Sequence, residues 1–301
     1  MTEPTETRCG VVAIVGAPNA GKSTLTNALV GQKVAIVSPK VQTTRTRLTG
    51  IAIDGDTQLL LIDTPGIFAP RRRLDRAMVA AAWEGAHAAD VIALVIDARA
   101  GLREDVEAIL DGLSERPETK ILVLNKVDLV AKEKLLGLAA RLDADHGFAR
   151  IFMVAAASGD GVADLKADLA ARMPPGPWLY PEDQLSDTTT RMMAAEITRE
   201  QLYLQLHDEL PYAATIETEQ WEERRDGSVA IHQQILIERD TQKAIVLGKG
   251  GARIKALGAA ARAELTEALG RRVHLFLHVK VAPNWSEDRG VYRDMGLGWV
   301  D

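Results

Sequence analysis

The first residues that could do chemistry form a glycine-rich stretch near the amino terminus. It reads Gly16-Ala17-Pro18-Asn19-Ala20-Gly21-Lys22-Ser23 and is followed by Thr24. The stretch follows an apolar run and opens a helical segment, which is the context that supports a phosphate loop. Backbone N–H groups of such a loop converge on phosphate oxygens, and the helix N-terminus adds positive potential. We expect Lys22 to reach the β- and γ-phosphates and the Ser23 hydroxyl to ligate Mg²⁺.

Two further segments supply candidate partners for the metal and the γ-phosphate. Asp63-Thr64-Pro65-Gly66 directly follows a second apolar run. Asp63 is expected to hold Mg²⁺ directly or through water, and the Gly66 N–H to contact the γ-phosphate. Between the two motifs lies Gln42-Thr43-Thr44-Arg45, where a threonine can close over Mg²⁺ when the γ-phosphate is present. We favour Thr44 as that ligand, with Thr43 as the alternative, so the predicted metal ligands are Ser23, Thr44 and Asp63.

A fourth motif, Asn125-Lys126-Val127-Asp128, has the residue types that recognise guanine. The Asp128 carboxylate can accept hydrogen bonds from guanine N1–H and N2–H₂, a donor pair that adenine lacks. Sites built on paired polar groups reject an unmatched analogue by ~10⁴ or more. Asn125 can tie this loop to the phosphate loop, and the Lys126 stem can cover the base.

A fifth element is expected to present a backbone N–H to guanine O6. Ala155-Ala156-Ala157 follows the last apolar run of this half and occupies that place. Guanine-binding GTPases usually have Ser-Ala here, so Ala155 loses a hydroxyl that braces the loop. The Ala156 N–H is the predicted donor, and the sequence therefore favours GTP and GDP as ligands.

Hydrolysis is expected to be slow, because the residue after Gly66 is Ile67, which cannot orient a water molecule through a polar group. The predicted catalytic residues are Lys22, Thr44, Gly66 and Asn19. Asn19 either helps to bind K⁺, which serves as a positive charge at the transition state, or simply stabilises the loop.

The elements that must position these motifs alternate along residues 9–173. Short Val/Ile/Leu-rich runs at 11–15, 59–62, 91–96, 121–124 and 151–154 are separated by helical stretches. Runs of this kind suit strands that are buried on both faces of a parallel sheet. The pattern predicts an α/β phosphate-loop GTPase domain with a mostly parallel, doubly wound sheet.

The segment 174–188 is rich in proline and reads as a linker to a second domain at 189–301. Residues 188–207 form an expected helix with threonines as N-caps. Two strands, 211–223 and 228–238, are joined through Arg225-Asp226-Gly227, a strong hairpin signal. A short helix, the turn Gly248-Lys249-Gly250-Gly251, a longer helix and a strand at 273–281 complete an α-β-β-α-α-β order, which is that of an α+β type II KH domain.

The glycine-rich turn is the predicted RNA-binding element of this domain. In KH domains a Gly-x-x-Gly loop approaches the backbone of about four nucleotides, and glycine permits this because it has no Cβ. Residues 239–281 contain nine Lys/Arg against three Asp/Glu, although the chain from 182 onward is net acidic. We therefore expect RNA contacts from Gly248, Lys249, Gly250, Gly251, Arg253 and Lys255.

Composition excludes several other classes of protein. The 301 residues favour about two domains. The single cysteine, Cys9, excludes an internal disulfide and a cysteine-rich zinc site, and fits a reducing compartment. Residues 1–8 are expected to be flexible and lack the features of a signal peptide, and no stretch approaches the ~18 apolar residues of a membrane span. The net charge of −6 argues against general nucleic-acid binding but allows a local basic patch.

Nearly the whole chain resembles the Era family of bacterial GTPases. The four nucleotide motifs alone would fit several related GTPases, and their combination with Ala244–Lys255 is specific to this family. The resemblance implies a monomer that binds the 3′ end of small-subunit ribosomal RNA and assists maturation of the small ribosomal subunit. It also implies a cytoplasmic location with a fraction on the inner face of the membrane.

Two alternatives remain open from the residues. A tRNA-modification or other ribosome-associated GTPase should lack the Gly-x-x-Gly domain, which this chain has. An RNA-binding scaffold with a catalytically dead nucleotide site would retain every motif. The three histidines His232, His274 and His278 are expected to be strand residues rather than metal ligands, and Arg71–Arg73 a solvated loop.

Overall fold

The computed structural model describes residues 7–40, 43–207 and 210–300 of the chain. Most of the predicted flexible start, and Gln42 of the predicted metal-closing segment, lie outside the described residues. The chain divides into two compact units, which we call unit 1 and unit 2. Unit 1 comprises the residues up to Val37, Thr44–Asp187 and Tyr292–Asp301, and unit 2 comprises Ser38–Thr43 and Thr188–Val291.

Unit 1 is built on a six-stranded sheet with the order β2-β3-β1-β4-β5-β6. Its strands are β1 (Arg8–Val15), β2 (Leu48–Asp54), β3 (Thr57–Asp63), β4 (Val91–Asp97), β5 (Thr119–Asn125) and β6 (Arg150–Val154). Only β2 runs antiparallel to its neighbour. The predicted mostly parallel sheet is confirmed. β2 was not anticipated because Thr49 and Gly50 interrupt its apolar residues.

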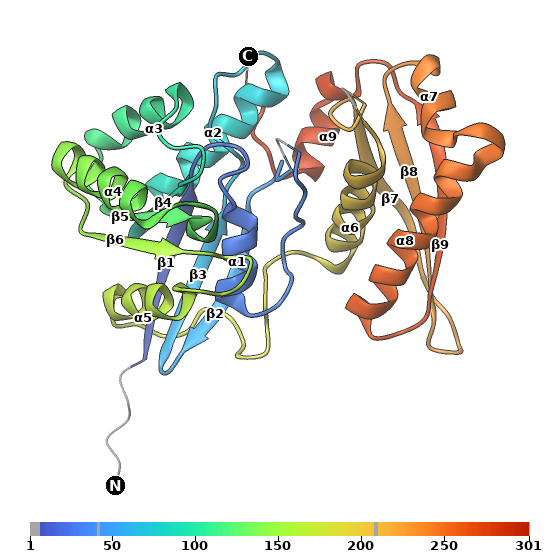
Figure 1. Cartoon of the computed structure of the whole chain (residues 1–301). Helices are drawn as coiled ribbons and strands as arrows, with labels where there is room; N and C mark the ends of the chain where they lie inside the picture. Colours follow the sequence, from blue (N-terminus) through green and yellow to red (C-terminus); the bar gives the residue numbers. More distant parts are fainter. Residues whose placement is uncertain (1–6, 41–42, 208–209, 301) are drawn as a thin grey trace, which may run out of the picture. The chain divides into compact units, whose positions relative to one another are not determined.

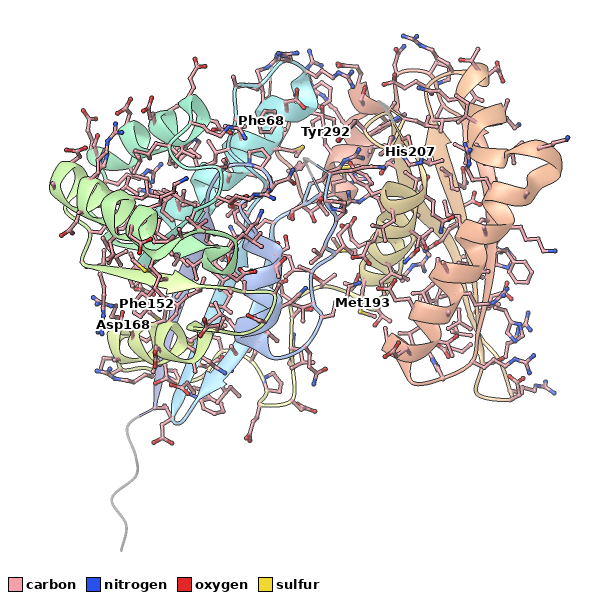
Figure 2. The ribbon with its side chains drawn as sticks, viewed as in Figure 1. Phe68, Phe152, Asp168, Met193, His207 and Tyr292 are labelled. Atoms are coloured by element: carbon pink, nitrogen blue, oxygen red, sulfur yellow. The ribbon has the colours of Figure 1, made fainter. Side chains whose placement is uncertain are left out.

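Helices cover both faces of this sheet (Figure 1). They are α1 (Lys22–Val30), α2 (Arg73–His87), α3 (Glu104–Ser114), α4 (Lys132–His146) and α5 (Val162–Arg172). Alternate residues of β1 face opposite layers. Val12 and Ile14 pack with α1 and α5, whereas Ala13 and Val15 pack with α2, α3 and α4. Asp168 of α5 also accepts hydrogen bonds from Arg150 and Arg172, beside Phe152 of β6 (Figure 2).

The proline-rich segment after α5 is bonded to residues of β1, β2 and β3. Pro174 O accepts a hydrogen bond from Cys9 N, and Leu185 O accepts one from Ile51 N. The fully buried Gln58 side chain accepts from the N–H groups of Leu179 and Tyr180 at 2.9 and 3.1 Å. Residues 174–187 are therefore held by unit 1 rather than forming a free connection.

The residues at the end of the described chain also belong to unit 1. Tyr292 and Leu297 are buried, and the Trp299 ring lies 4.9 Å from that of Tyr292. The Arg73 guanidinium lies over the Trp299 ring at 4.4 Å. Arg73 is the first residue of α2, so the expectation that it belongs to a solvated loop is wrong. The indole of Trp299, which is distant in the sequence, stacks on the Arg73 guanidinium.

Unit 2 has a three-stranded sheet with the order β7-β8-β9 and helices on it. Its main elements are α6 (Thr190–Gln205), β7 (Ala214–Glu223), β8 (Val229–Ile237), α7 (Asp240–Leu247), α8 (Ala252–Leu269) and β9 (Val273–Val281). β7 and β8 are antiparallel, and β8 and β9 are parallel. Met193 of α6 packs with Ile231 and Leu265 in one of its apolar clusters (Figure 2). The predicted α-β-β-α-α-β order is confirmed.

One strand boundary differs from the prediction, and one helix was not predicted. β7 begins at Ala214 rather than at 211, because the preceding residues form turns. A register shift between Thr218 and Gln220 then interrupts its pairing with β8. After β9, a helix α9 spans Arg289–Asp294. Within the described residues, the structure has no helix that is long and apolar enough to cross a membrane.

Candidate functional site

The predicted phosphate loop lies between β1 and α1. Gly16 has a φ of +153°, and a Cβ there would lie 2.3 Å from Val95 O, so only glycine fits. Asn19 adopts the left-handed region with a φ of 62°. α1 begins at Lys22, whose ammonium donates to Gly16 O and Ala17 O at 3.1 and 3.0 Å. The loop therefore curls around the lysine that is expected to meet the phosphates.

Three oxygen donors meet at the predicted metal site. Ser23 Oγ lies 2.7 Å from Asp63 Oδ2 and 2.8 Å from Thr44 Oγ1. Thr44 Oγ1 lies 3.4 Å from the same carboxylate oxygen. The Thr43 hydroxyl instead bonds to the Ser38 hydroxyl and to Lys40 O. The structure therefore places Thr44, the favoured ligand, in this cluster, and not Thr43, the alternative.

The buried carboxylate of this cluster lacks a full set of partners. Asp63 is 0% exposed, and its Oδ1 has no hydrogen-bond partner among the described residues. Burial raises the pKa of Asp63 to about 6, although the Ser23 hydroxyl and the Lys22 charge act in the opposite direction. Burial likewise lowers the pKa of Lys22 to about 8. Hydroxyl and carboxylate oxygens around an unsatisfied buried charge are the donor set that Mg²⁺ prefers, so these residues fit that ion.

The residues after Asp63 are fixed against the phosphate loop. Thr64 Oγ1 donates to Ile14 O at 2.8 Å. A Cβ at Gly66 would lie 2.9 Å from Pro18 N, so glycine is required for this approach. Ile67 donates its N–H to Gly16 O, and its side chain is buried with the apolar cluster of α2 and α3. A buried isoleucine agrees with the expectation that Ile67 orients no water.

Asn125 connects three loops of the site. Its Nδ2 donates to Ala20 O at 2.9 Å, and its Oδ1 accepts from Lys126 N and Ala156 N at 2.9 and 3.1 Å. A Cβ at Gly21 would lie 2.2 Å from Asn125 Nδ2, which explains the glycine there. Asp128 is exposed on the next turn, where a base can reach its carboxylate.

The Ala155–Ala157 loop differs in one detail from the prediction. The Ala156 N–H, which the sequence assigned to guanine O6, already donates to Asn125. Asn125 Oδ1 accepts this N–H at 3.1 Å, and position 155 carries no hydroxyl group. Ala155 N is bonded to Asp160 O, so the next N–H along the loop is that of Ala157.

Asp97 is a site residue that the sequence reasoning missed. Its carboxylate forms an ion pair with Lys126 Nζ at 2.7 Å, and Lys126 Nζ also donates to Asn19 O at 2.6 Å. Asp97 ends β4 beside Asn125 of β5 in the parallel register. An acidic residue at the end of the strand that precedes the Asn-Lys-x-Asp strand was the available signal.

The Gly-x-x-Gly turn of unit 2 is exposed at the start of α8. Gly248, Gly250 and Gly251 have φ values of 70, 59 and 77°, and a Cβ at Gly250 or Gly251 would meet nothing within 4 Å. Lys249 and Lys255 are exposed, and α8 carries no acidic residue in its first turn. The turn therefore offers an open backbone, a helix N-terminus and cations.

Arg253 has a structural partner that the sequence did not indicate. Its Nη1 donates to Ile245 O of α7 at 2.8 Å, and Gly248 packs closely on its backbone. A positive charge in the first turn of a helix is disfavoured by the helix dipole. The bond from Arg253 to α7 therefore accounts in part for this arginine. The carbonyls at the C-terminal end of α7 stabilise it.

A groove of about 490 Å³ lies farther along unit 2, between α8 and β9. Arg262 and Thr266 of α8 line one side, and residues 272–276 line the other. The Phe276 ring is 47% exposed and stacks on His232 with the ring centroids 4.6 Å apart. The exposed aromatic ring and nearby arginines were not selected from the sequence.

Comparisons with known proteins agree with both halves. Residues 11–126 match the model of the 50S ribosome-binding GTPase family, and residues 209–286 match the KH domain. The GTPase Era of Afipia carboxidovorans is 62% identical over 97% of this chain and 94% of its own length. That of Erythrobacter litoralis is 60% identical over 100% of both chains. The chain belongs to the Era family of GTPases.

Solved Era structures have the same fold. A crystal structure of Era in complex with MgGDPNP and nucleotides 1506–1542 of 16S ribosomal RNA has a TM-score of 0.92 and 36% identity, covering 96% of this chain and 99% of that one. An Aquifex aeolicus Era variant bound to GDP·AlF₄⁻ has the same TM-score and coverage. A GTPase fold followed by a KH fold, and GTP hydrolysis as the family's reaction, are therefore shown for this chain.

Proposed function

We propose that the chain is a GTP-hydrolysing assembly factor that binds the 3′ end of small-subunit ribosomal RNA and promotes maturation of the small subunit. The observation that carries this proposal is the pairing of two sites in one chain. Unit 1 holds a phosphate loop, a metal cluster and a guanine motif, and unit 2 exposes a Gly-x-x-Gly turn with cations. The full-length similarity to Era proteins supports the same conclusion.

In the nucleotide site, we assign the polyphosphate to residues 16–24. The loop N–H groups and the α1 N-terminus bind the phosphate oxygens, and the Lys22 ammonium turns from Gly16 O toward them. Ser23, Thr44 and Asp63 would hold Mg²⁺, which neutralises charge on the β- and γ-phosphates when bound. Gly66 presents its N–H to the γ-phosphate, held in place by Pro18.

We assign the base to the loops that Asn125 connects. Asp128 accepts from guanine N1–H and N2–H₂, and the Lys126 stem, fixed by Asp97, covers the ring. Because the Ala156 N–H is engaged by Asn125, we assign guanine O6 to the N–H of Ala157. The loss of a serine at Ala155 is thereby compensated by Asn125, without loss of guanine specificity.

In unit 2, we assign single-stranded RNA to the turn Gly248–Gly251. Lys249 and Lys255 lie near phosphates, and Arg253 contributes its charge while it anchors α7. The groove with Arg262 and Phe276 offers cations and a stacking surface farther along α8. A cytoplasmic monomer with a fraction on the inner face of the membrane remains our proposal from the family resemblance alone.

Phosphate release from GTP tests this function against a catalytically dead scaffold. We expect slow turnover by the purified chain and faster turnover when small ribosomal subunits or their 3′ RNA end are added, because Ile67 supplies no polar group to orient water. The chain with Lys22→Ala is the control for contaminating activity. RNA binding without any phosphate release above that control would support the scaffold instead.

We also propose that Asn19 helps to bind K⁺ beside the phosphates. The left-handed loop residue lies next to Lys126 Nζ, which bonds to its carbonyl and orients the peptide. A cation there would act as a fixed positive charge in the transition state. We expect hydrolysis about tenfold faster in K⁺ than in Na⁺ at equal ionic strength, with the difference lost in Asn19→Ala. Equal rates of the native chain in both salts would leave Asn19 with the loop-stabilising role.

A further inference from the structure

Four arginines gather at the start of α2, within unit 1. They are Arg71, Arg72, Arg73 and Arg76, and α2 begins at Arg73. Arg73 is half-buried, with its guanidinium stacked on the Trp299 ring. The other three side chains are exposed. We call Arg71, Arg72 and Arg76 the arginine patch.

The charges of the arginine patch are not neutralised by the part of the chain that the structure describes. None of its three guanidinium groups forms an ion pair with a described residue. Asp75 is the acidic residue in the first turn of α2, and its Oδ2 accepts from the backbone N–H groups of Arg71 and Arg72 at 3.1 and 3.0 Å. One carboxylate that caps the helix offsets at most one of the four positive charges.

The helix dipole makes this arrangement unfavourable for α2 on its own. The N-terminal end of a helix is positive, so acidic residues stabilise the first turn and cations destabilise it. The neighbouring helices of unit 1 follow this rule, since α3 has Glu104, Asp105 and Glu107 in its first turn and α5 has Asp164. Helix stability therefore does not explain the arginines of α2, whereas a bound anion would remove their repulsion.

The donors of the arginine patch suit phosphate groups. A guanidinium is planar and bonds phosphate oxygens in a bidentate manner, which an ammonium cannot do. Arg72 and Arg76 are four residues apart, so their side chains project from the same side of α2. Donors of this kind fix a protein on a phosphate backbone but do not read the base sequence.

The aromatic ring beside the patch favours duplex RNA over single-stranded RNA. Single strands are usually bound by stacking their bases on free aromatic rings. The Trp299 ring already contacts the Arg73 guanidinium at 4.4 Å and the Tyr292 ring at 4.9 Å. It thereby holds the start of α2 in place instead of offering a surface for bases.

We propose that the arginine patch is a second RNA-binding surface, which contacts the phosphate backbone of duplex RNA without regard to sequence. It belongs to unit 1 and is distinct from the Gly-x-x-Gly turn of unit 2. The inference rests on the proposed function only in taking RNA, rather than another polyanion, as the partner. It deepens that function by giving the GTPase unit its own contact with structured RNA.

The experiment measures the affinity of the full chain for two RNA probes at several salt concentrations. One is a hairpin of unrelated sequence with a stem longer than one helical turn, and the other is a single-stranded copy of the small-subunit 3′ end. In Arg71→Gln with Arg72→Gln and Arg76→Gln, we expect hairpin affinity to fall at least about tenfold. The slope of log affinity against log salt should become shallower by about two, because fewer counterions are released. Affinity for the single-stranded probe should change less than about threefold.

Matched variants separate local charge from net charge and from structure. Lys132→Gln with Lys134→Gln and Arg141→Gln removes the same charge from exposed positions on α4, and hairpin affinity should stay within about twofold of the native value. Lysine at all three patch positions keeps the charge and should restore the native salt slope. The glutamine variant should unfold at no lower temperature than the native chain, because the dipole disfavours the arginines. Arg76→Gln alone should reduce the slope by about one and replaces the triple variant if that does not fold.

Native hairpin affinity and salt slope in the glutamine variant, or an equal loss in the α4 variant, would overturn the proposal. Loss of binding to phosphatidylglycerol vesicles with hairpin binding retained would also overturn it, and would assign the patch to a membrane surface. If the native chain bound the hairpin through the patch but did not bind the single-stranded 3′ end, the proposed function would fail while this inference stood.

Discussion

Replacing Asp128 with asparagine is expected to change the preferred nucleotide from GTP to XTP. Two charge-assisted hydrogen bonds to guanine, at about 1.5–3 kcal/mol each, would be lost, so GTP affinity should fall about 10²- to 10⁴-fold. Xanthine carries an oxygen in place of the N2 amino group, and an amide can donate to it. Binding of fluorescent GTP and XTP analogues to the native chain and to Asp128→Asn would measure the exchange.

A matched control is available on a neighbouring helix. Asp111 is also exposed, and Asp111→Asn removes the same charge from α3, away from the nucleotide motifs. Asp111→Asn should leave the affinities for GTP and XTP at their native values. Unchanged GTP affinity in Asp128→Asn would show that the base is bound elsewhere. A loss of GTP without a gain of XTP would show that Asp128 supports the loop rather than contacting the base.

The second large effect is expected from two aspartates in the Gly-x-x-Gly turn. Lys249→Asp with Gly250→Asp places like charge against RNA phosphates and adds a Cβ where the backbone should approach. Gly250 has a φ of 59°, and aspartate tolerates the left-handed region better than most residues, so the turn should keep its shape. We expect RNA affinity to fall by at least about tenfold, with a shallower salt dependence because fewer counterions are released.

The measurement is the affinity for a single-stranded RNA copy of the small-subunit 3′ end at several salt concentrations. Arg224→Asp with Arg225→Ser is the control, since it changes the net charge equally at the exposed β7–β8 turn. GDPNP binding should be native in both double variants. Tight RNA binding by a folded turn variant would move the RNA surface elsewhere on unit 2.

The motifs were predictable from the sequence because each is made by neighbouring residues in a fixed backbone. The curl of the loop around Lys22 and the tie from Asn125 to Ala20 follow from local spacing and from the parallel order of the strands. The order of elements in unit 2 was predictable for the same reason, since the hairpin and the glycine turn are local signals.

What could not be predicted depends on residues that are distant in the chain. Asp97 meets Lys126 only because β4 and β5 are neighbours in the sheet. The partner of Arg253 is a carbonyl of another helix, and the Ala156 N–H was taken by an amide whose orientation depends on three loops. A polar side chain in such a place has several acceptors within reach, and only packing decides between them.

The stacking of Trp299 on Arg73 has a consequence for synthesis on the ribosome. Residues 292–300 complete unit 1 but are made after all of unit 2, whereas Ser38–Thr43 of unit 2 are made before most of unit 1. Domains generally fold as the chain emerges, amino-terminal first. The start of α2 therefore stays without its Trp299 contact until all of unit 2 has been translated, and this contact of unit 1 forms last during synthesis.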